Sequence, residues 1–496
     1  MKRSAGILLH PTSLPSRYAI GDFGPTAFAF VDFLAQARVH VWAVLPLTIP
    51  DMTGSPYASV SAHALTWLCV SPDQLVHDGL LPATALPRSR PTDNVSYATA
   101  YHQRRTVLKD AFSHFQKNGS PAHHRAVRQF IRRESYWLTE YATFMAIKQR
   151  YHDMPWFRWP RALAEHRSAE LRHWRARHAR EIAFFEFEQW VTQSQWLRLK
   201  GYAHRQGVSI FGDIPFFVTH DSVDVWAHQN QFLLNKKHLP ITIAGVPPDY
   251  FGRRGQIWDN PHYNWQVMQK NHFHWWISRF RRASRLYDLT RVDHFRGFDT
   301  VWHIPFGART ARRGSWEPVP GHKLLTEVRR RVSGLSIVAE DLGTITPTVA
   351  TLRKKFGLPS MRVLQFSFSG FPDNTHMPKN FRGPIVAYTG THDNDTSRGW
   401  FTTSSTSDER WLAGERLRAD EHTFAQKLIA YGMATRAQLF IVPLQDILNL
   451  GSEARMNKPG TKRGNWRWRF QPHHLHAEHA QRLARLIRIT GRGHAI

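Results

Sequence analysis

The sequence predicts an α/β protein built on a (β/α)8 TIM barrel, with a large helical insertion between strands 2 and 3 and further loop insertions around the active-site cleft. Three observations predict this fold. Eight short apolar runs follow one another along the 496 residues, and helical stretches separate most of them. Four of the runs also bring an acidic residue to, or just beyond, their carboxyl end.

The eight runs have the composition of strands that are buried on both faces of a parallel sheet, because they are apolar, often β-branched, and end in polar residues. We expect strands at Gly6–His10, Val41–Leu47, Val208–Phe217, Leu289–Phe295, Leu335–Asp341, Met361–Phe368, Pro384–His392 and Leu439–Asp446. We expect connecting helices at Ala27–Ala37, Leu324–Val332, Thr346–Phe356 and Glu421–Tyr431. Residues 1–496 are therefore expected to form a single catalytic barrel, with its active site at the carboxyl ends of the strands.

Two long gaps interrupt the regular spacing. The gap of about 160 residues between the second and third runs is too long for a simple crossover, so residues 64–205 are expected to form a mainly helical insertion subdomain. Within it, Ala126–Ile147 and His166–Trp196 read as amphipathic helices. Residues 226–265 follow the third strand and are rich in Pro, Gly and aromatic residues, which predicts an active-site loop insertion.

The composition restricts the class of protein. Cys69 is the single cysteine, so no intrachain disulfide can form. The apolar run near the amino terminus is too short for a signal peptide, and no stretch is long and apolar enough to span a membrane. We therefore expect a soluble, cytoplasmic protein with no membrane partner.

The formal charge of +28 could indicate a polyanionic partner such as nucleic acid. The basic residues are scattered, and no recognised nucleic-acid motif organises them. A solvated basic surface is therefore the favoured interpretation, and a nucleic-acid partner is the less favoured one. Examples of this scatter are Arg104, Arg105, Arg132, Arg133, Arg281, Arg282 and Arg329 to Arg331.

Four acidic residues stand at the expected carboxyl ends of different strands: Asp213, Asp293, Glu340 and, just after the seventh strand, Asp393. An acid at one strand end is commonly a helix cap or a loop ligand. Four such acids converge on one cavity of a barrel, which favours catalysis. Glycoside cleavage needs two carboxyl groups, one as nucleophile or base and one as proton donor, and a third can orient hydroxyl groups.

The neighbours of these acids fit that chemistry. Arg291 shares a strand face with Asp293 and can keep it ionised, as a nucleophile requires. Glu340 follows apolar residues, so burial could raise its pKa and keep a proton available. His392 and Asp393 could hold sugar hydroxyls. His294 and His392, each taken alone, could equally be structural histidines at strand ends.

Other chemistries lack their motifs. The chain contains no HExxH, paired CxxC, Walker-type GxxxxGK or GxSxG sequence. We therefore expect no metal and no cofactor.

At these same residues the sequence resembles the amylomaltase family of 4-α-glucanotransferases, which is related to the α-amylase clan. The similarity runs in order over nearly the whole chain. The matching segments are LLHPTSLPS (Leu8–Ser16), GDFGPTAFAFVDFLA (Gly21–Ala35), GDIPFFVTHDSVDVW (Gly212–Trp226), AGVPPDYF (Ala244–Phe251), RVDHFRGF (Arg291–Phe298), AEDLGTITP (Ala339–Pro347), GLPSMRVLQF (Gly357–Phe366), YTGTHDNDT (Tyr388–Thr396), LGSEARMNKPGT (Leu450–Thr461) and GNWRWR (Gly464–Arg469).

The resemblance implies Asp293 as nucleophile, Glu340 as acid/base and Asp393 as the third carboxylate. It also implies that Tyr250 and Phe251, on a loop that arches over the cleft, stack on glucose rings. The alternative for this pair is packing of the loop against the barrel. The further substrate contacts that the resemblance implies are Tyr57, Asp213, Asp249, Trp258, Arg291, His294, His392 and Asn465.

The chain departs from the family pattern mainly between Ala43 and Trp67, where Ala43 replaces a usual Gln, and at Asp259, which replaces a usual Gly. These departures bear on substrate length and pocket shape more than on the reaction. The expected function is therefore retaining transfer of α-1,4-glucan segments between maltooligosaccharides. The alternatives are an α-1,4-glucan hydrolase and a catalytically weak glucan-binding or nucleic-acid-associated protein.

Overall fold

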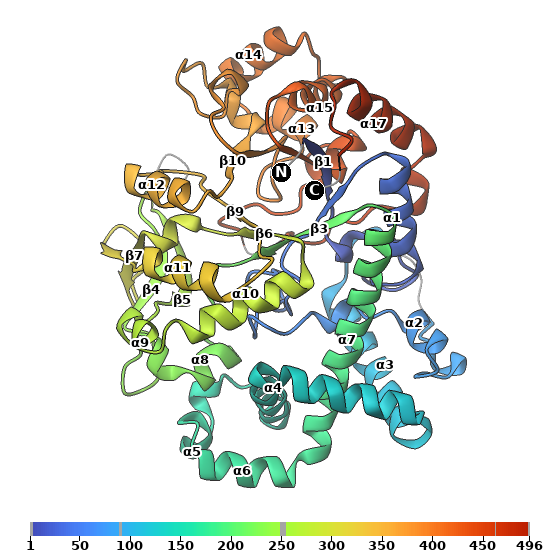
Figure 1. Cartoon of the computed structure of the whole chain (residues 1–496), viewed down its shortest axis with the longest axis vertical. Coiled ribbons are helices and arrows are strands. Elements are labelled where there is room, and N and C mark those ends of the chain that lie inside the picture. Colours follow the sequence, from blue (N-terminus) through green and yellow to red (C-terminus); the bar gives the residue numbers. More distant parts are fainter. Residues whose placement is uncertain (1–2, 89–91, 249–253, 462, 495–496) are drawn as a thin grey trace.

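A closed barrel of eight parallel strands forms the centre of the molecule (Figure 1). The computed structural model describes residues 3–88, 92–248, 254–461 and 463–494. Each strand pairs with the next barrel strand along the chain, and the last pairs with the first, which confirms the predicted fold class. The barrel strands are β1 (Ser4–Leu8), β2 (Val41–Ala43), β3 (Ser209–Ile214), β6 (Leu289–Val292), β9 (Ile337–Ala339), β10 (Ser360–Val363), β11 (Ile385–Tyr388) and β12 (Leu439–Pro443).

The alternation of side chains along each strand explains why these runs close a barrel. In β2, Val41 and Ala43 belong to a buried cluster that fills the barrel interior together with residues such as Phe211 of β3. Trp42, between them, lies on the outer face, where its ring packs 5.1 Å from that of Phe30. Both faces of the strand are therefore buried, as its uniformly apolar sequence predicts.

The structure contains the helices α1 (Pro25–Gln36), α2 (Pro72–His77), α3 (Tyr97–Asn118), α4 (Pro121–Arg150), α5 (Arg161–Ala164), α6 (Ser168–Arg177), α7 (Ala179–Arg205), α8 (Val223–Ala227), α9 (Trp265–Lys270), α10 (His274–Leu286), α11 (Gly321–Arg331), α12 (Pro347–Lys355), α13 (Ser397–Gly399), α14 (Ser407–Leu417), α15 (Phe424–Ala434), α16 (Leu444–Ile447) and α17 (Ala477–Ile489). The connection from β10 to β11 contains only two 3-10 turns, because residues 369–384 are rich in Gly and Pro. None of the described helices is both long and apolar enough to cross a membrane.

The helical insertion comprises α2 to α7, all between β2 and β3, and it forms the lower part of Figure 1. The predicted single helix His166–Trp196 is wrong in one respect, because the chain breaks at His178 into α6 and α7. Leu171 and Trp174 of α6 are buried, as are the apolar residues along α7.

A second sheet of four antiparallel neighbours lies outside the barrel and was not predicted from the sequence. Its strands, in spatial order, are β5 (Gln256–Pro261), β4 (Thr242–Val246), β7 (Thr300–Pro305) and β8 (Ser315–Pro318). Two strands come from the loop insertion after β3 and two from the connection after β6. The central pairing of this sheet, β4 with β7, therefore joins two segments that are far apart in the sequence. A local hairpin signal cannot predict such a pairing.

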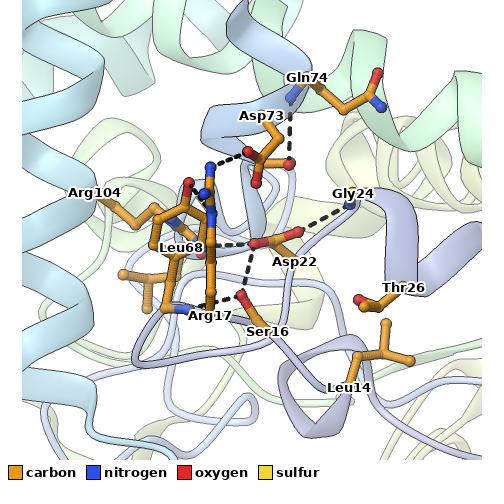
Figure 2. A network of polar contacts seen from close by, with 12 residues as sticks. Leu14, Ser16, Arg17, Asp22, Gly24, Thr26, Leu68, Asp73, Gln74 and Arg104 are labelled. Carbon is orange, nitrogen blue, oxygen red and sulfur yellow. Dashed lines mark hydrogen bonds and ion pairs between the residues drawn. The ribbon is translucent and has the colours of Figure 1, made fainter. Parts of the chain in front are cut away.

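A buried ion pair attaches the helical insertion to the barrel (Figure 2). The guanidinium of Arg104, on α3, donates a hydrogen bond of 2.8 Å to Asp22, in the segment that leads into α1. Arg104 also donates to the carbonyl oxygen of Leu68 and lies over the ring of Tyr18. Nearby, Arg17 contacts Asp73 in a solvent-exposed pair. The pair of Arg104 and Asp22 is fully buried, so a polar contact inside the protein joins the insertion to the barrel.

Candidate active site

Arg291 connects three of the residues that were expected at the site. Its Nη2 donates a hydrogen bond of 2.7 Å to Asp293 Oδ1, while its Nη1 contacts the carboxylate of Asp213. The hydroxyl of Tyr57, from the loop after β2, donates to Asp213 Oδ2 at 2.7 Å. Asp213 belongs to β3, Arg291 to β6, and Asp293 follows β6 directly, so the parallel strands deliver all three to the same end of the barrel.

The guanidinium and the carboxylates stabilise each other's charges. Burial alone would lower the pKa of Arg291, but Asp213 and Asp293 outweigh it and raise this pKa well above its ordinary value. For Asp213, only 3% exposed, burial raises the pKa and Arg291 opposes that rise. Arg291 is therefore a permanent cation beside Asp293.

Glu340 occupies a different environment on the neighbouring strand. It follows β9 immediately, and its two carboxyl oxygens accept hydrogen bonds from the backbone N–H groups of His294, at 2.8 Å, and Leu342, at 3.0 Å. Burial nevertheless raises the pKa of Glu340 to about 7, because Arg291 and the two N–H groups offset it only in part. At neutral pH a substantial fraction of this carboxyl group therefore carries a proton.

Asp393 lies in the loop after β11 and is held by residues that follow β12. The side-chain amide of Asn457 donates a hydrogen bond of 2.6 Å to Asp393 Oδ1. Arg455 donates to the backbone carbonyl of Asp393 at 2.7 Å. The Nε2 atom of His392 lies 3.3 Å from Asp393 Oδ1, and the Asp393 side chain is 45% exposed. The Asp393 side chain is thus more exposed than those of Asp213, at 3%, and Asp293, at 29%.

An aromatic wall stands beside these carboxylates. The rings of Tyr57 and His392 stack with centroids 5.2 Å apart, and Trp466 packs against both of them. Trp466 has a left-handed backbone, with φ of 65°, which is unusual for a residue other than glycine. The surrounding contacts, including a hydrogen bond from Trp466 N to the carbonyl of Met456, hold this conformation.

Trp258 and His294 form a second aromatic contact on the side of the small sheet. Trp258, on β5, meets the His294 ring edge-on with centroids 5.0 Å apart. Burial lowers the pKa of His294 to about 4, so its imidazole is neutral at neutral pH. The neighbouring Asp259 has φ of 60°, the left-handed region where glycine is unstrained and Asp is among the better-tolerated alternatives.

The structure does not bring every expected residue into this cluster. The side chain of Asn465 is occupied within its own turn, where it accepts from Lys458 N and donates to the Thr461 carbonyl. It neighbours Trp466 at the rim. Asp249, Tyr250 and Phe251 lie outside the described residues.

The sequence reasoning did not single out Asn457, Arg455 or Trp466. All three belong to the segments LGSEARMNKPGT and GNWRWR, which carry the family resemblance, so the signal was present but was not attached to individual residues. A small pocket lies against the cluster. Its polar lining residues are Asp213, Arg291, Tyr388, Thr391 and His392.

The geometry matches one class of chemistry. A carboxylate paired with a guanidinium stands near a carboxyl group with a pKa of about 7, and this is the division of roles that two-carboxylate glycoside cleavage requires.

Comparisons with known proteins point in the same direction. A family model described as Glyco_hydro_77, 4-alpha-glucanotransferase, matches residues 9–475. The 4-alpha-glucanotransferase of Synechocystis sp. is 42% identical, covering 99% of this chain and 98% of its own length. That of Thermus thermophilus is 41% identical, covering 99% of both chains. Among solved structures, the amylomaltase from Streptococcus agalactiae in complex with acarbose superposes with a TM-score of 0.94 at 34% identity, covering 99% of this chain and all of its own.

Proposed function

This chain belongs to the 4-α-glucanotransferase family and transfers α-1,4-glucan segments between maltooligosaccharides, and we propose that Asp293 is its nucleophile and Glu340 its acid/base. The observation that carries the assignment is the difference between the two environments. Arg291 pairs with Asp293 at 2.7 Å, whereas burial raises the pKa of Glu340 to about 7. An ionised carboxylate suits attack on carbon, and a protonated carboxyl group suits protonation of oxygen.

In the first step, Asp293 attacks the anomeric carbon of the donor glucan and forms a covalent glycosyl–enzyme. Glu340 donates its proton to the departing glycosidic oxygen, so the leaving glucan departs with a neutral hydroxyl group. Arg291 pairs with the attacking carboxylate at 2.7 Å.

In the second step, Glu340 is ionised and removes a proton from a hydroxyl group of the acceptor glucan. That oxygen attacks the anomeric carbon and releases Asp293, so the configuration at this carbon is retained after two inversions. One α-1,4 bond is broken and one is made, so the exchange needs no external energy source.

We assign the remaining contacts by their position around this pair. Asp393, with its exposed carboxylate, is the third acid and binds sugar hydroxyls, together with Tyr57 and His392. Asp213 and Arg291, which pair with each other, and Trp258 and His294, whose rings are in contact, are further substrate contacts. The proposal retains Asn465, Asp249, Tyr250 and Phe251 as substrate contacts.

Single substitutions test the two catalytic roles separately. Asp293→Asn and Glu340→Gln should each reduce disproportionation of maltotriose by at least about 1,000-fold, because each removes a group that the chemistry needs. A maltosyl fluoride donor separates them, since fluoride leaves without a proton. Glu340→Gln should release the first equivalent of fluoride within about tenfold of the rate of the unmodified enzyme and then stall, because the second step still needs Glu340, whereas Asp293→Asn should release none.

Matched controls exist close by. Asp299→Asn keeps a side-chain oxygen that can accept the hydrogen bond from the Thr348 hydroxyl. Glu327→Gln makes the same change as Glu340→Gln on the outer helix α11. Both variants should keep the activity of the unmodified enzyme. If Asp293→Asn cleaved the fluoride, or if either catalytic variant kept most of its activity on maltotriose, the role assignment would be wrong.

Transfer and hydrolysis share the same covalent intermediate and differ only in what attacks it. Water is present at about 55 M, so transfer wins only where the acceptor is held with a high effective concentration and water is partly excluded. Maltotriose should therefore give maltopentaose and longer oligomers with a constant number of reducing ends. A rise in reducing ends that matches substrate loss, without longer oligomers, would identify a glucan hydrolase instead.

The proposed partners are neutral glucans alone. We also propose that the enzyme works in the cytoplasm and that nucleic acid is not its ligand. In support, the basic residues are spread over many elements, and several, such as Arg104, Arg282 and Arg492, are buried and bonded inside the protein.

A further inference from the structure

The chain returns to the active site after its last barrel strand, and this segment donates two hydrogen bonds to Asp393 and one to its neighbour His392. Asn457 Nδ2 donates to Asp393 Oδ1 at 2.6 Å. Asn457 N donates to the backbone carbonyl of His392 at 3.0 Å. Arg455 Nη2 donates to the backbone carbonyl of Asp393 at 2.7 Å. Both the backbone and the side chain of the third acid are therefore fixed by residues 455–457.

Asn457 is itself held in place. Its backbone carbonyl accepts a hydrogen bond of 2.8 Å from Arg455 Nε, so one guanidinium bridges Asp393 and Asn457. The next residue, Lys458, donates its N–H to the side chain of Asn465. The amide of Asn457 consequently approaches Asp393 from an anchored backbone rather than from a free loop.

The two oxygens of Asp393 have different surroundings. Oδ1 accepts from Asn457 and lies 3.3 Å from His392 Nε2. In the part of the chain that the structure describes, Oδ2 has no hydrogen-bond partner, and the side chain is 45% exposed. One oxygen is thus fixed by the protein, and the other is left for a ligand.

We propose that Asn457 is a positioning residue, which orients Asp393 so that its second carboxylate oxygen is free to accept from sugar hydroxyls. The inference rests on the proposed role of Asp393 and extends it to a residue that never touches the substrate. An amide N–H can only donate, so the bond from Asn457 specifies which way the carboxylate of Asp393 faces. A freely rotating Asp393 would meet the sugar in the productive orientation only part of the time.

Two substitutions at Asn457 test the donor role. Asn457→Ala removes the donor and should lower kcat/KM for maltotriose about 10- to 100-fold at every pH. Asn457→Asp places a second carboxyl group against Asp393, so both cannot be ionised without repulsion and the pair shares a proton. At acidic pH the protonated new carboxyl group can donate to Asp393, as the amide does.

The pH profile supplies the decisive readout. We expect the activity of Asn457→Asp, divided by that of the unmodified enzyme at the same pH, to rise at least tenfold between pH 8 and pH 5. The same ratio for Asn457→Ala should stay flat. A matched control is Asn271→Asp, which adds the same charge where the side-chain oxygen only accepts from His274 N, and it should behave like the unmodified enzyme.

Further outcomes separate this inference from the assignment of Asp393. If Asp393→Asn were fully active, the proposed role of Asp393 would fail. If Asp393→Asn were inactive while Asn457→Ala equalled the unmodified enzyme, only the positioning role would fail. If both Asn457 variants had a lowered melting temperature and an activity ratio that did not change with pH, Asn457 would support folding alone. This result would also overturn the proposal.

Discussion

At the scale of residues, the guanidinium of Arg291 interacts differently with the two catalytic acids, Asp293 and Glu340. Arg291 bonds directly to Asp293, but it influences Glu340 only through space. The two carboxyl groups therefore have different surroundings, because Asp293 is paired with a cation whereas burial raises the pKa of Glu340. This asymmetry lets two chemically similar groups perform opposite tasks in the same step.

The protonation state of Glu340 predicts the alkaline side of the pH profile. Burial raises the pKa of Glu340 to about 7, so the proton-donor form is present below this pH and is lost above it. We expect kcat/KM for maltotriose to fall about tenfold per pH unit above about pH 8. A maltosyl fluoride donor, which needs no protonation, should not show this fall. A maltotriose plateau extending beyond pH 9 would contradict the prediction.

The residues of the site could be predicted to different extents. Asp293 and Glu340 each follow a strand, and barrel geometry sends all strand ends to one face, so local sequence sufficed to predict that they meet. The contact between Asn457 and Asp393 joins segments that follow two different strands, β12 and β11. Its formation depends on how the later loop folds back, which strand periodicity does not encode.

At the scale of elements, the helical insertion is built into the barrel rather than appended to it. We propose that residues 64–205 form one mainly helical subdomain and that residues 226–265 form an active-site insertion. Glu134 of α4 pairs with Arg282 and Arg285 of α10, the helix that leads into the barrel strand β6. We expect insertion and barrel to unfold in one cooperative transition.

The buried pair of Figure 2 tests this attachment. Arg104→Met should lower the free energy of unfolding by about 3–5 kcal/mol, because it leaves the buried carboxylate of Asp22 without its cation. Burial already raises the pKa of Asp22, so the deficit should grow as the pH rises and Asp22 ionises. Denaturant titrations at pH 5 and pH 8 measure both effects.

The exposed pair beside it is the control. Arg17→Met breaks the contact with Asp73 at a guanidinium that is 52% exposed, so the loss should stay below about 1 kcal/mol. The double variant Arg104→Met with Asp22→Asn should recover part of the stability. Equal, small losses for Arg17→Met and Arg104→Met would show that the buried pair does not attach the insertion.

Elements were predictable where their signal was local. The barrel strands are continuous apolar runs, and the long helices are periodic, so both could be recognised within short windows of sequence. The second sheet could not be recognised in this way, because β4 pairs with β7 from another insertion and β8 is mostly exposed. Its stability comes from tertiary pairing that short windows of sequence do not contain.

At the scale of the whole molecule, the charge of +28 is separate from the reaction. A neutral glucan gains nothing from long-range attraction to a basic surface. We expect the rate on maltotriose to change less than about twofold between about 50 and 500 mM salt, since screening alters only interactions between charges. A steep fall with salt, together with tight and sequence-selective nucleic-acid binding, would favour a different partner.

The closure of the barrel has a consequence for synthesis of the protein on the ribosome. β1 pairs with β2 on one side and with β12 on the other, and 431 residues separate Leu8 from Leu439. At translation rates of about 5–20 residues per second, roughly 20–90 s pass between the emergence of these two strands. For that interval one edge of β1 has no partner, and its apolar residues are exposed to other nascent chains. We therefore expect a chaperone that shields nascent amino-terminal segments to increase the yield of folded enzyme. In a circular permutant that begins between β11 and β12, the strand that waits for its partner should be β12 instead of β1, because β11 is then made last.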